Sequence, residues 1–150
     1  MMNPKRILLV EDSPYDAELA MTALEDSNLL NQVAWVKDGQ EALHYLFREG
    51  LYAGRAAGHP VVVLLDLKMP RVDGLQVLER LKRDPELRIV PVVMLTSSSQ
   101  ETDLARSYGL GVNAYVVKPV GFPEFADALR ELGLFWAVVN QPPPGSAAPE

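Results

Sequence analysis

The sequence of 150 residues contains no cysteine, which excludes disulfide bonds, thiolate chemistry and cysteine-based zinc sites. It also lacks a long apolar run at its start. The four residues from Ile7 to Val10 are followed at once by Glu11 and Asp12, so the run is too short for a signal peptide or a membrane span. Positive charge is scarce as well, and the net charge of −6 argues against a nucleic-acid-binding surface. These absences predict a cytoplasmic protein that binds neither membrane nor nucleic acid.

The residues that are present suit one folded domain, since 48% are hydrophobic and 23% are charged. The apolar run 61–65 ends at the single acid Asp66, much as the run 7–10 ends at Glu11. Neither run alternates apolar with polar residues. Such strands are buried on both faces, which is typical of a parallel sheet covered by helices.

The pattern of strands and helices predicts a doubly wound α/β fold, because five strands alternate with five helices. The predicted strands are 7–10, 32–36, 61–65, 92–95 and 114–117. Of the two common strand orders, five strands favour the flavodoxin-like order 2-1-3-4-5 over 3-2-1-4-5. We predict one domain over residues 1–140, with an extended C-terminal helix, and a disordered proline-rich tail over 141–150.

Three acids are expected to meet at the carboxyl edge of this sheet. In the order 2-1-3-4-5 the first and third strands are neighbours, so Glu11, Asp12 and Asp66 converge. Crowded carboxylates repel one another and lose hydration, which a hard divalent cation would compensate. Mg²⁺ is the natural candidate, because it binds through few carboxylates and retains waters.

The fourth and fifth strands add a hydroxyl and an ammonium group to the same edge, from Thr96 and Lys118. A metal pocket, a nucleophilic carboxylate and two groups that can hold phosphoryl oxygens suit phosphoryl transfer to a carboxylate. Each residue alone has an ordinary explanation: Asp12 or Thr96 can begin a helix, and lysines are common at surfaces. The combination at four strand ends favours the chemical interpretation.

These residues resemble the receiver domain of bacterial two-component response regulators, the CheY-like family. The resemblance is carried by Glu11-Asp12, by Asp66 with Met69-Pro70 and Asp73-Gly74, by Thr96-Ser97 and by Lys118-Pro119, and it covers nearly the whole chain.

The resemblance implies that Asp66 accepts a phosphoryl group from a sensor histidine kinase. It implies a Mg²⁺ site made by Glu11, Asp12, Asp66 and the backbone carbonyl of Lys68, with Thr96 and Lys118 contacting the phosphoryl group. Tyr115 matches the aromatic position that moves with Thr96 on switching. The family also implies a cis Lys118-Pro119 bond. Such a domain is a phosphoacceptor that assists its own phosphorylation and dephosphorylation, and is not a conventional enzyme.

Further features refine the resemblance. The short tail predicts a stand-alone receiver, and the long loop before Asp66 with the late Phe135-Trp136 resembles the regulators paired with bacterial phytochromes. Lys68 and Ser98 occupy positions that tune dephosphorylation in the family. The kinase and the downstream protein are not named by the sequence.

Two other functions remain open at this point. A metal-dependent phosphatase of the haloacid dehalogenase type would also pass through an aspartyl-phosphate, but its nucleophile lies on the first strand, whereas Asp66 lies in mid-chain. A phosphorylation-independent interaction module would keep only the fold, yet this chain has both the acids and the lysine.

The end of the predicted fifth helix suggests a homodimer. Every residue from Leu134 to Val139 is apolar, so a helical arrangement leaves some of them facing outward, where a partner can cover them. We therefore predict a twofold dimer with Phe135 and Trp136 as anchors. The alternative is that this segment folds back onto its own domain.

Overall fold

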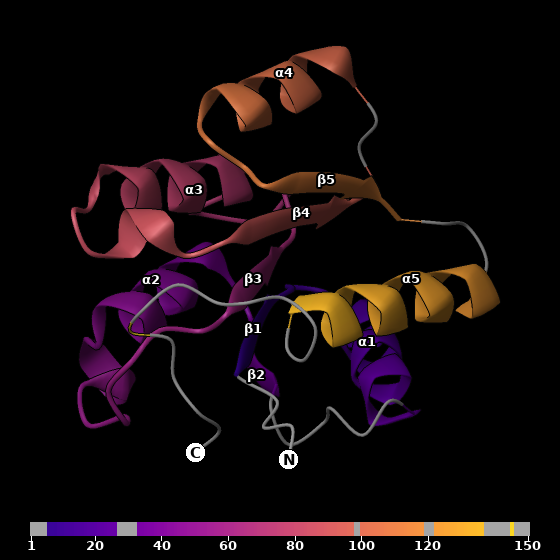
Figure 1. Cartoon of the computed structure of the whole chain (residues 1–150), viewed down its shortest axis with the longest axis horizontal. Coiled ribbons are helices and arrows are strands. Elements are labelled where there is room, and N and C mark those ends of the chain that lie inside the picture. The colour runs from indigo at the N-terminus through magenta and orange to yellow at the C-terminus, as the bar shows by residue number, and fades with distance from the viewer. Residues whose placement is uncertain (1–5, 27–32, 98–99, 119–121, 137–144, 146–150) are drawn as a thin grey trace.

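The computed structural model describes residues 6–26, 33–97, 100–118, 122–136 and 145. Its strands are β1 (Ile7–Val10), β2 (Val33–Val36), β3 (Val62–Leu65), β4 (Val92–Thr96) and β5 (Ala114–Val117). The helices are α1 (Pro14–Asp26), α2 (Gly39–Phe47), α3 (Gly74–Arg83), α4 (Glu101–Gly109) and α5 (Phe122–Leu134), with short 3₁₀ turns η2 (Gly50–Tyr52) and η3 (Leu87–Ile89). All strands are parallel and lie in the order β2-β1-β3-β4-β5 (Figure 1), which confirms the predicted flavodoxin-like fold.

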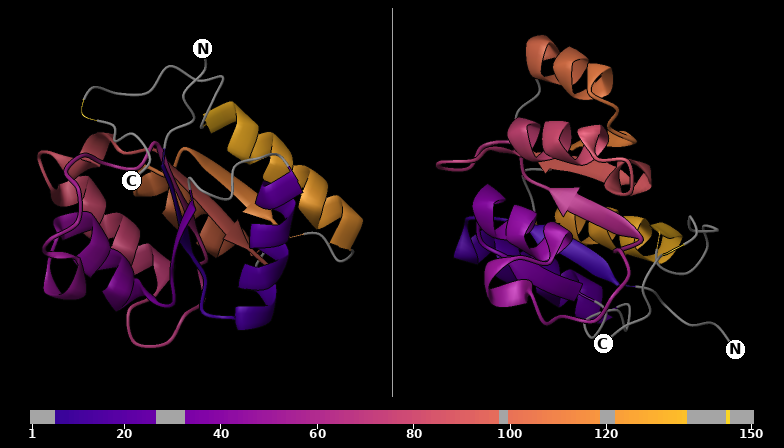
Figure 2. Two further views of the ribbon diagram at one scale, coloured as in Figure 1. Left: turned by 90° about the horizontal axis from the view of Figure 1, so that it is seen from below. Right: turned by 90° about the vertical axis from the view of Figure 1, so that its left-hand side faces the viewer.

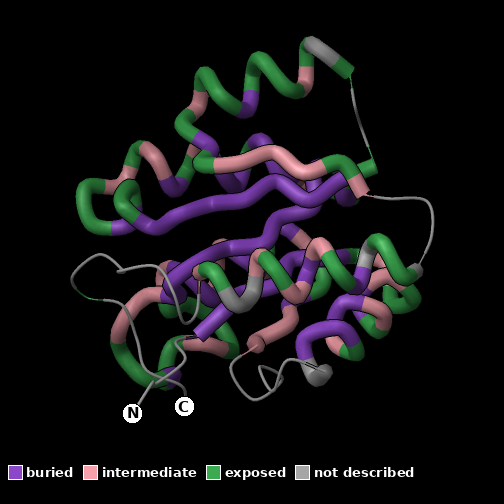
Figure 3. The backbone as a smooth tube through the Cα atoms, turned by 45° about the vertical axis from the view of Figure 1, so that its right-hand side comes forward, coloured by how far each residue is buried: buried purple, intermediate pink, exposed green. Residues whose placement is uncertain are grey.

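Helices cover both faces of the sheet. α1 packs beside α5 on one face, and α2 packs beside α3 on the other (Figure 2), while α4 lies beside β5. Side chains alternate between the two apolar cores, since Leu8 and Val10 of β1 join the core under α2 and α3, and Ile7 and Leu9 join the core under α1 and α5. The strands β1, β3 and β4 are buried along their whole length (Figure 3), as their uninterrupted apolar sequences predict.

The register of the sheet brings the candidate residues to one edge. Val10 lies opposite Leu65 in the β1–β3 pair, so the next residues, Glu11 and Asp66, leave their strands at the same level. β4 and β5 end together in the same way, with Thr96 opposite Val117. The acids that follow β1 and β3 therefore share the carboxyl edge of the sheet with the last residue of β4 and the first residue after β5.

Side chains from the preceding loops fix the starts of two helices. Asp73 accepts a hydrogen bond from the backbone N–H of Gln76 at 3.0 Å, and the Gln76 side chain accepts one from the Asp73 N–H at 2.9 Å, which completes a capping box at α3. At α2, Asp38 accepts from the Glu41 N–H at 2.8 Å. The Glu41 carboxylate accepts from the Lys37 N–H at 3.4 Å and not from the Asp38 N–H, so the capping box at α2 is only half formed.

Residue 145 is the part of the predicted tail that the structure describes. The Gly145 carbonyl oxygen accepts a hydrogen bond from the His59 N–H at 3.0 Å. The other residues of 141–150 lie outside the described ranges, so the boundary at 140 and the disorder of the tail stay predictions. Among the residues described, no helix combines the length and the apolar character that crossing a bilayer requires.

Candidate functional site

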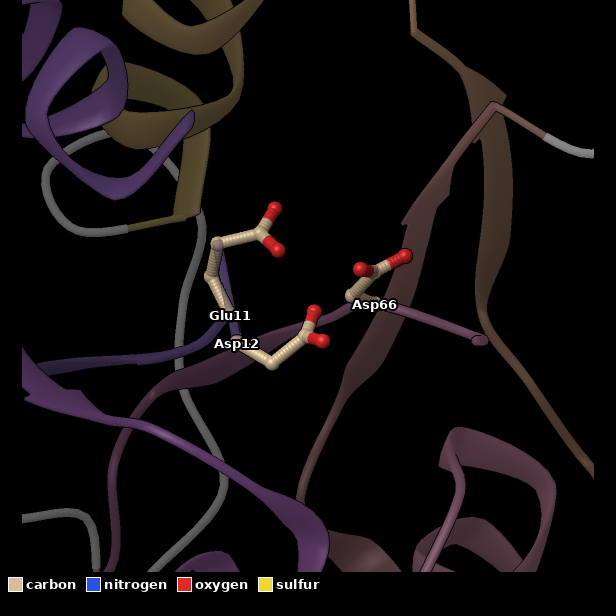
Figure 4. A group of neighbouring side chains, drawn as sticks. All are labelled: Glu11, Asp12 and Asp66. Carbon is tan, nitrogen blue, oxygen red and sulfur yellow. The ribbon is translucent and has the colours of Figure 1, made fainter. Parts of the chain in front are cut away.

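Three carboxyl groups converge at the carboxyl edge of the sheet. Glu11, Asp12 and Asp66 each offer an oxygen atom, and these atoms lie within 4.8 Å of one another (Figure 4). Sheet contacts hold the backbone at both strand ends, since the Glu11 N–H donates to the Val36 carbonyl and the Asp66 N–H donates to the Val10 carbonyl, each at 3.1 Å. Glu11 and Asp66 are buried and Asp12 is exposed. The predicted convergence of the three acids is therefore present in the structure.

Lys118 brings a positive charge to this acid cluster, defined as Glu11, Asp12 and Asp66. Its Nζ atom lies 2.5 Å from Glu11 Oε1, 3.0 Å from Asp16 Oδ2 and 3.9 Å from Asp66 Oδ2. The Lys118 N–H donates to the Thr96 carbonyl at 2.7 Å, which ties the lysine to the end of β4. The ammonium group thus stands between the first turn of α1 and the acid cluster.

The other predicted residues lie around this edge. Thr96 is fully buried at the end of β4, and Tyr115 is half-buried against the core under α2 and α3. The Lys68 side chain does not add its charge to the acid cluster: its Nζ atom lies 3.4 Å from Asp103 Oδ2 of α4. The Lys68 carbonyl stays a predicted metal ligand. The predicted cis Lys118-Pro119 bond and Ser98 involve residues outside those that the structure describes.

The sequence of residues 7–130 matches the family described as the response regulator receiver domain. The chain belongs to this receiver domain family. The match favours the receiver interpretation over the phosphatase of the haloacid dehalogenase type.

Several relatives share both sequence and fold with this receiver domain. Response regulator Rcp1 of Synechocystis sp. is 37% identical over 133 residues, which are 89% of each chain, and its Mn²⁺-bound structure superimposes with a TM-score of 0.85 over 93% of this chain and 99% of that one. The phosphorylated cyanobacterial phytochrome response regulator RcpA is 38% identical with a TM-score of 0.86, and the match covers 93% of this chain and 99% of that one. The bacteriophytochrome response regulator RtBRR is 57% identical with a TM-score of 0.74, and the match covers 95% of this chain and 86% of that one.

The residues of the acid cluster fit a hard cation such as Mg²⁺. They offer carboxylate oxygens from three side chains within one small space, and Mg²⁺ is bound in proteins through one or two carboxylates and waters. Asp12, the exposed member, leaves the cluster open to solvent on its side. In this receiver domain Glu11, Asp12 and Asp66 are therefore the side chains that could hold such a cation.

Burial dominates the acid–base chemistry of the acid cluster. It raises the pKa of Glu11 from 4.5 to about 7, although the hydrogen bond from Lys118 opposes the rise, and the neighbouring charge of Asp66 adds to it. Burial also raises the pKa of Asp66, against the attraction of Lys118. Near neutral pH, protons therefore compete with a cation for these carboxylates.

This competition predicts that stabilisation by Mg²⁺ depends on pH. At pH 8, where Glu11 is ionised, we expect a hundredfold excess of Mg²⁺ over its Kd to stabilise the fold by about 3 kcal/mol and to raise the Tm by about 5–10 °C relative to EDTA. At pH 6 the gain should be much smaller, because protonated Glu11 binds metal poorly. In EDTA the dependence of stability on pH runs in the opposite direction. The pKa of Glu11 is higher in the folded protein than in the unfolded chain, so Glu11 contributes fully to stability below pH 4.5, and this contribution is lost as the pH rises through about 7.

Thermal melts at the two pH values, with Mg²⁺ and with EDTA, provide the measurement. Asp12→Ala should lose most of the gain, whereas Asp127→Ala, which removes an exposed carboxylate on α5, should keep it. Identical wild-type melting at pH 8 in Mg²⁺ and in EDTA would show that the acid cluster is not a metal site.

Two residues at the site were not singled out from the sequence. Asp16 is an acid in the first turn of α1, and its carboxylate accepts a hydrogen bond from Lys118. The Trp35 indole N–H donates to the Glu11 carbonyl oxygen at 2.9 Å. For Asp16 a signal existed, because an acid in the first turn of the helix that follows Glu11-Asp12 lies near the same sheet edge. For Trp35 the sequence held no signal.

Proposed function

We propose that this receiver domain accepts a phosphoryl group on Asp66 from a sensor histidine kinase and signals through the resulting change in its surface. The observation that carries the proposal is the placement of Asp66. Its carboxylate lies at the end of β3, within the acid cluster, with the Lys118 ammonium 3.9 Å from Oδ2. This arrangement gives a nucleophile, a candidate metal site and a fixed cation at one point.

The chemistry is a transfer between two nucleophiles. A carboxylate oxygen of Asp66 attacks the phosphorus of a phosphohistidine, the P–O bond forms, and the P–N bond breaks with its electron pair going to the imidazole nitrogen. Lys118 neutralises charge on the phosphoryl oxygens, and the Thr96 hydroxyl donates a hydrogen bond to one of them. Bound Mg²⁺ supplies further positive charge for these oxygens. Water-driven hydrolysis of the same P–O bond ends the signal.

Thr96 and Tyr115 are the residues we propose for the switch. Thr96 ends β4 at the site, and Tyr115 lies on the adjacent β5, where its Cα pairs with Met94, two residues before Thr96. Movement of Thr96 toward a phosphoryl group vacates space beside Tyr115. Two positions of the Tyr115 ring would then alter the surface formed by α4, β5 and α5.

The signalling system is proposed to be of the phytochrome type, with a bacteriophytochrome as the kinase. Support comes from the 57% identity to the bacteriophytochrome response regulator RtBRR and from the likeness to the cyanobacterial phytochrome regulator RcpA. We place this signalling in the cytoplasm, where ATP is available for autophosphorylation of the kinase. The downstream protein is a partner that distinguishes the two switch states.

Phosphotransfer tests this function directly. Radiolabelled, autophosphorylated bacteriophytochrome kinase is mixed with the wild-type protein, and label should pass to the receiver domain within seconds to minutes. Crystals with and without beryllofluoride should then differ in the positions of Thr96 and Tyr115. Absence of transfer from any kinase of the source organism, or steady turnover of p-nitrophenyl phosphate, would contradict the proposal.

We also propose a homodimer through α5 and β5. Phe135, directly after α5, is 47% exposed and lines a hollow of about 270 Å³ together with Val116, Ala128, Glu131 and Leu132. Trp136 contacts the Phe135 ring edge to face and packs partly against the core under α1 and α5. Phe135 is therefore the better candidate for the exposed anchor, and Trp136 also serves its own domain.

Replacing Phe135 by alanine should dissociate this dimer. Loss of a central aromatic anchor weakens association by about tenfold or more, so the variant should be monomeric at micromolar concentrations where the wild type is dimeric. Size-exclusion chromatography with light scattering measures the mass. Leu51→Ala is the matched control, since Leu51 is 96% exposed but lies in η2. A monomeric wild type at high micromolar concentration, with and without beryllofluoride, would refute the dimer.

A further inference from the structure

The Lys118 ammonium group binds one carboxylate that is outside the acid cluster. Asp16 Oδ2 lies 3.0 Å from Lys118 Nζ, yet Asp16 is not among the three side chains whose oxygens converge within 4.8 Å. Lys118 is therefore held from two directions. Glu11 and Asp66 attract it toward the acid cluster, and Asp16 attracts it toward α1.

Both ends of the Lys118–Asp16 contact are anchored by the fold. The Asp16 N–H donates to the Oγ atom of Ser13 at 3.2 Å, which fixes the first turn of α1. At the other end, the Lys118 N–H is bound to the Thr96 carbonyl of β4. The lysine side chain is 12% exposed and the Asp16 side chain 35% exposed, so the contact is partly shielded from water and keeps more strength than a surface ion pair.

In the proposed function two cations, the Lys118 ammonium group and Mg²⁺, compete for the Glu11 carboxylate. It is the acceptor nearest to Lys118, at 2.5 Å, and it belongs to the acid cluster that fits Mg²⁺. Each cation bound to Glu11 lowers the attraction of that carboxylate for the other. Binding of the metal therefore favours movement of the ammonium group toward an acceptor outside the acid cluster, and Asp16 already provides one.

We propose that Asp16 is a positioning residue for Lys118: it retains the ammonium group beside Asp66 when Glu11 and Asp66 are engaged by a metal ion. This inference rests on the proposed function, because it concerns how the lysine and the metal share the phosphorylation site. Among the residues that the structure describes, the carboxylates that remain in ion-pair reach of Lys118 without Asp16 are those of Glu11 and Asp66, which are also the proposed metal ligands. Lys118 then competes with Mg²⁺ for the Glu11 and Asp66 carboxylates, whereas with Asp16 present both cations can be held at the site together.

A double-mutant cycle read out by Mg²⁺ binding tests this role. Isothermal titration with MgCl₂ at pH 8 should show that Asp16→Asn raises the Kd for Mg²⁺ by about three- to tenfold, the size typical of one charge-assisted contact. Asp16→Glu should restore most of the affinity, because it keeps the charge. In a Lys118→Ala background the competing cation is gone, so adding Asp16→Asn should change the Kd by less than about twofold. The initial rate of phosphorylation by acetyl phosphate at subsaturating Mg²⁺ should follow the same pattern.

Glu18→Gln is the matched control for charge. Glu18 is an exposed acid on the same helix, whereas the ion pairs found for Lys118 among the described residues are to Glu11, Asp16 and Asp66, so replacing Glu18 measures the long-range effect of one lost negative charge. Equal effects of Asp16→Asn with and without Lys118 would overturn the proposal, as would an effect no larger than that of Glu18→Gln or a wild type that binds no Mg²⁺. If Mg²⁺ binding shows the predicted coupling but the wild type gains no phosphoryl group, the proposed function fails and the link between Asp16 and Lys118 stands.

Discussion

Replacing Asp66 by asparagine should abolish phosphorylation while leaving the fold intact. Asparagine keeps the size of the side chain but removes the carboxylate nucleophile, so intact-mass measurement after treatment with acetyl phosphate and Mg²⁺ should detect one added phosphoryl group on the wild type and none on the variant. The variant should also melt at the same temperature as the wild type or higher in EDTA at pH 8. The reason is that burial disfavours the ionised form of Asp66, as the raised pKa of this carboxyl records.

The control for this experiment is an acid outside the site. Asp127→Asn removes an exposed carboxylate of α5 and should be phosphorylated at the wild-type rate. A phosphorylated Asp66→Asn protein would show that another residue is the acceptor. A wild type that gains no mass under the same conditions would remove the basis for the assignment itself.

The second large effect is expected from Gly74→Ala, which should destabilise the fold by about 2–3 kcal/mol and lower the Tm by about 5–10 °C. A Cβ atom at residue 74 would lie 2.3 Å from the Asp66 carbonyl oxygen and 2.9 Å from the Leu67 Cα. Both are backbone atoms of the segment that carries the proposed phosphoacceptor, so they cannot move aside without displacing Asp66. We therefore also expect slower phosphorylation by acetyl phosphate.

Gly109→Ala provides the comparison that isolates this contact. Gly109 is the last residue of α4, and a Cβ atom there would meet nothing within 4 Å. Since alanine is the better helix former, this variant should melt at the wild-type temperature or slightly above it. If Gly74→Ala melted within about one degree of Gly109→Ala, the close approach of α3 to the end of β3 would not constrain the site.

The strand order and the acid cluster could be predicted from the sequence because both follow from simple patterns. Strands buried on both faces appear in the sequence as uninterrupted apolar runs, and the carboxyl ends of parallel strands lie at a common edge of the sheet. Glu11 and Asp66 each follow such a run directly, so their meeting required only that β1 and β3 be neighbours. The N-cap at Asp73 was predictable for a similar reason, since capping depends on residues close in sequence.

Contacts between different structural elements could not be predicted in this way. Arg55 is buried in the loop before β3, where its Nε donates to the Tyr45 carbonyl at 2.6 Å and its guanidinium lies 4.5 Å from the centre of the Tyr45 ring. The sequence identified this segment only as a long loop before Asp66. Likewise, the pairing of Lys68 with Asp103 depends on where α4 comes to lie, and a sequence pattern does not specify that position.

The position of β1 inside the sheet, between β2 and β3, also governs the order in which the chain can fold. β1 is made first during synthesis, yet it pairs on one side with β2 and on the other with β3, whose residues 62–65 are made much later. Until β3 emerges from the ribosome, the apolar strand Ile7–Val10 has a free hydrogen-bonding edge that can pair with another nascent chain. Because such long-range parallel pairing is slow to form, ribosome pausing between β2 and β3 would prolong the aggregation-prone stage.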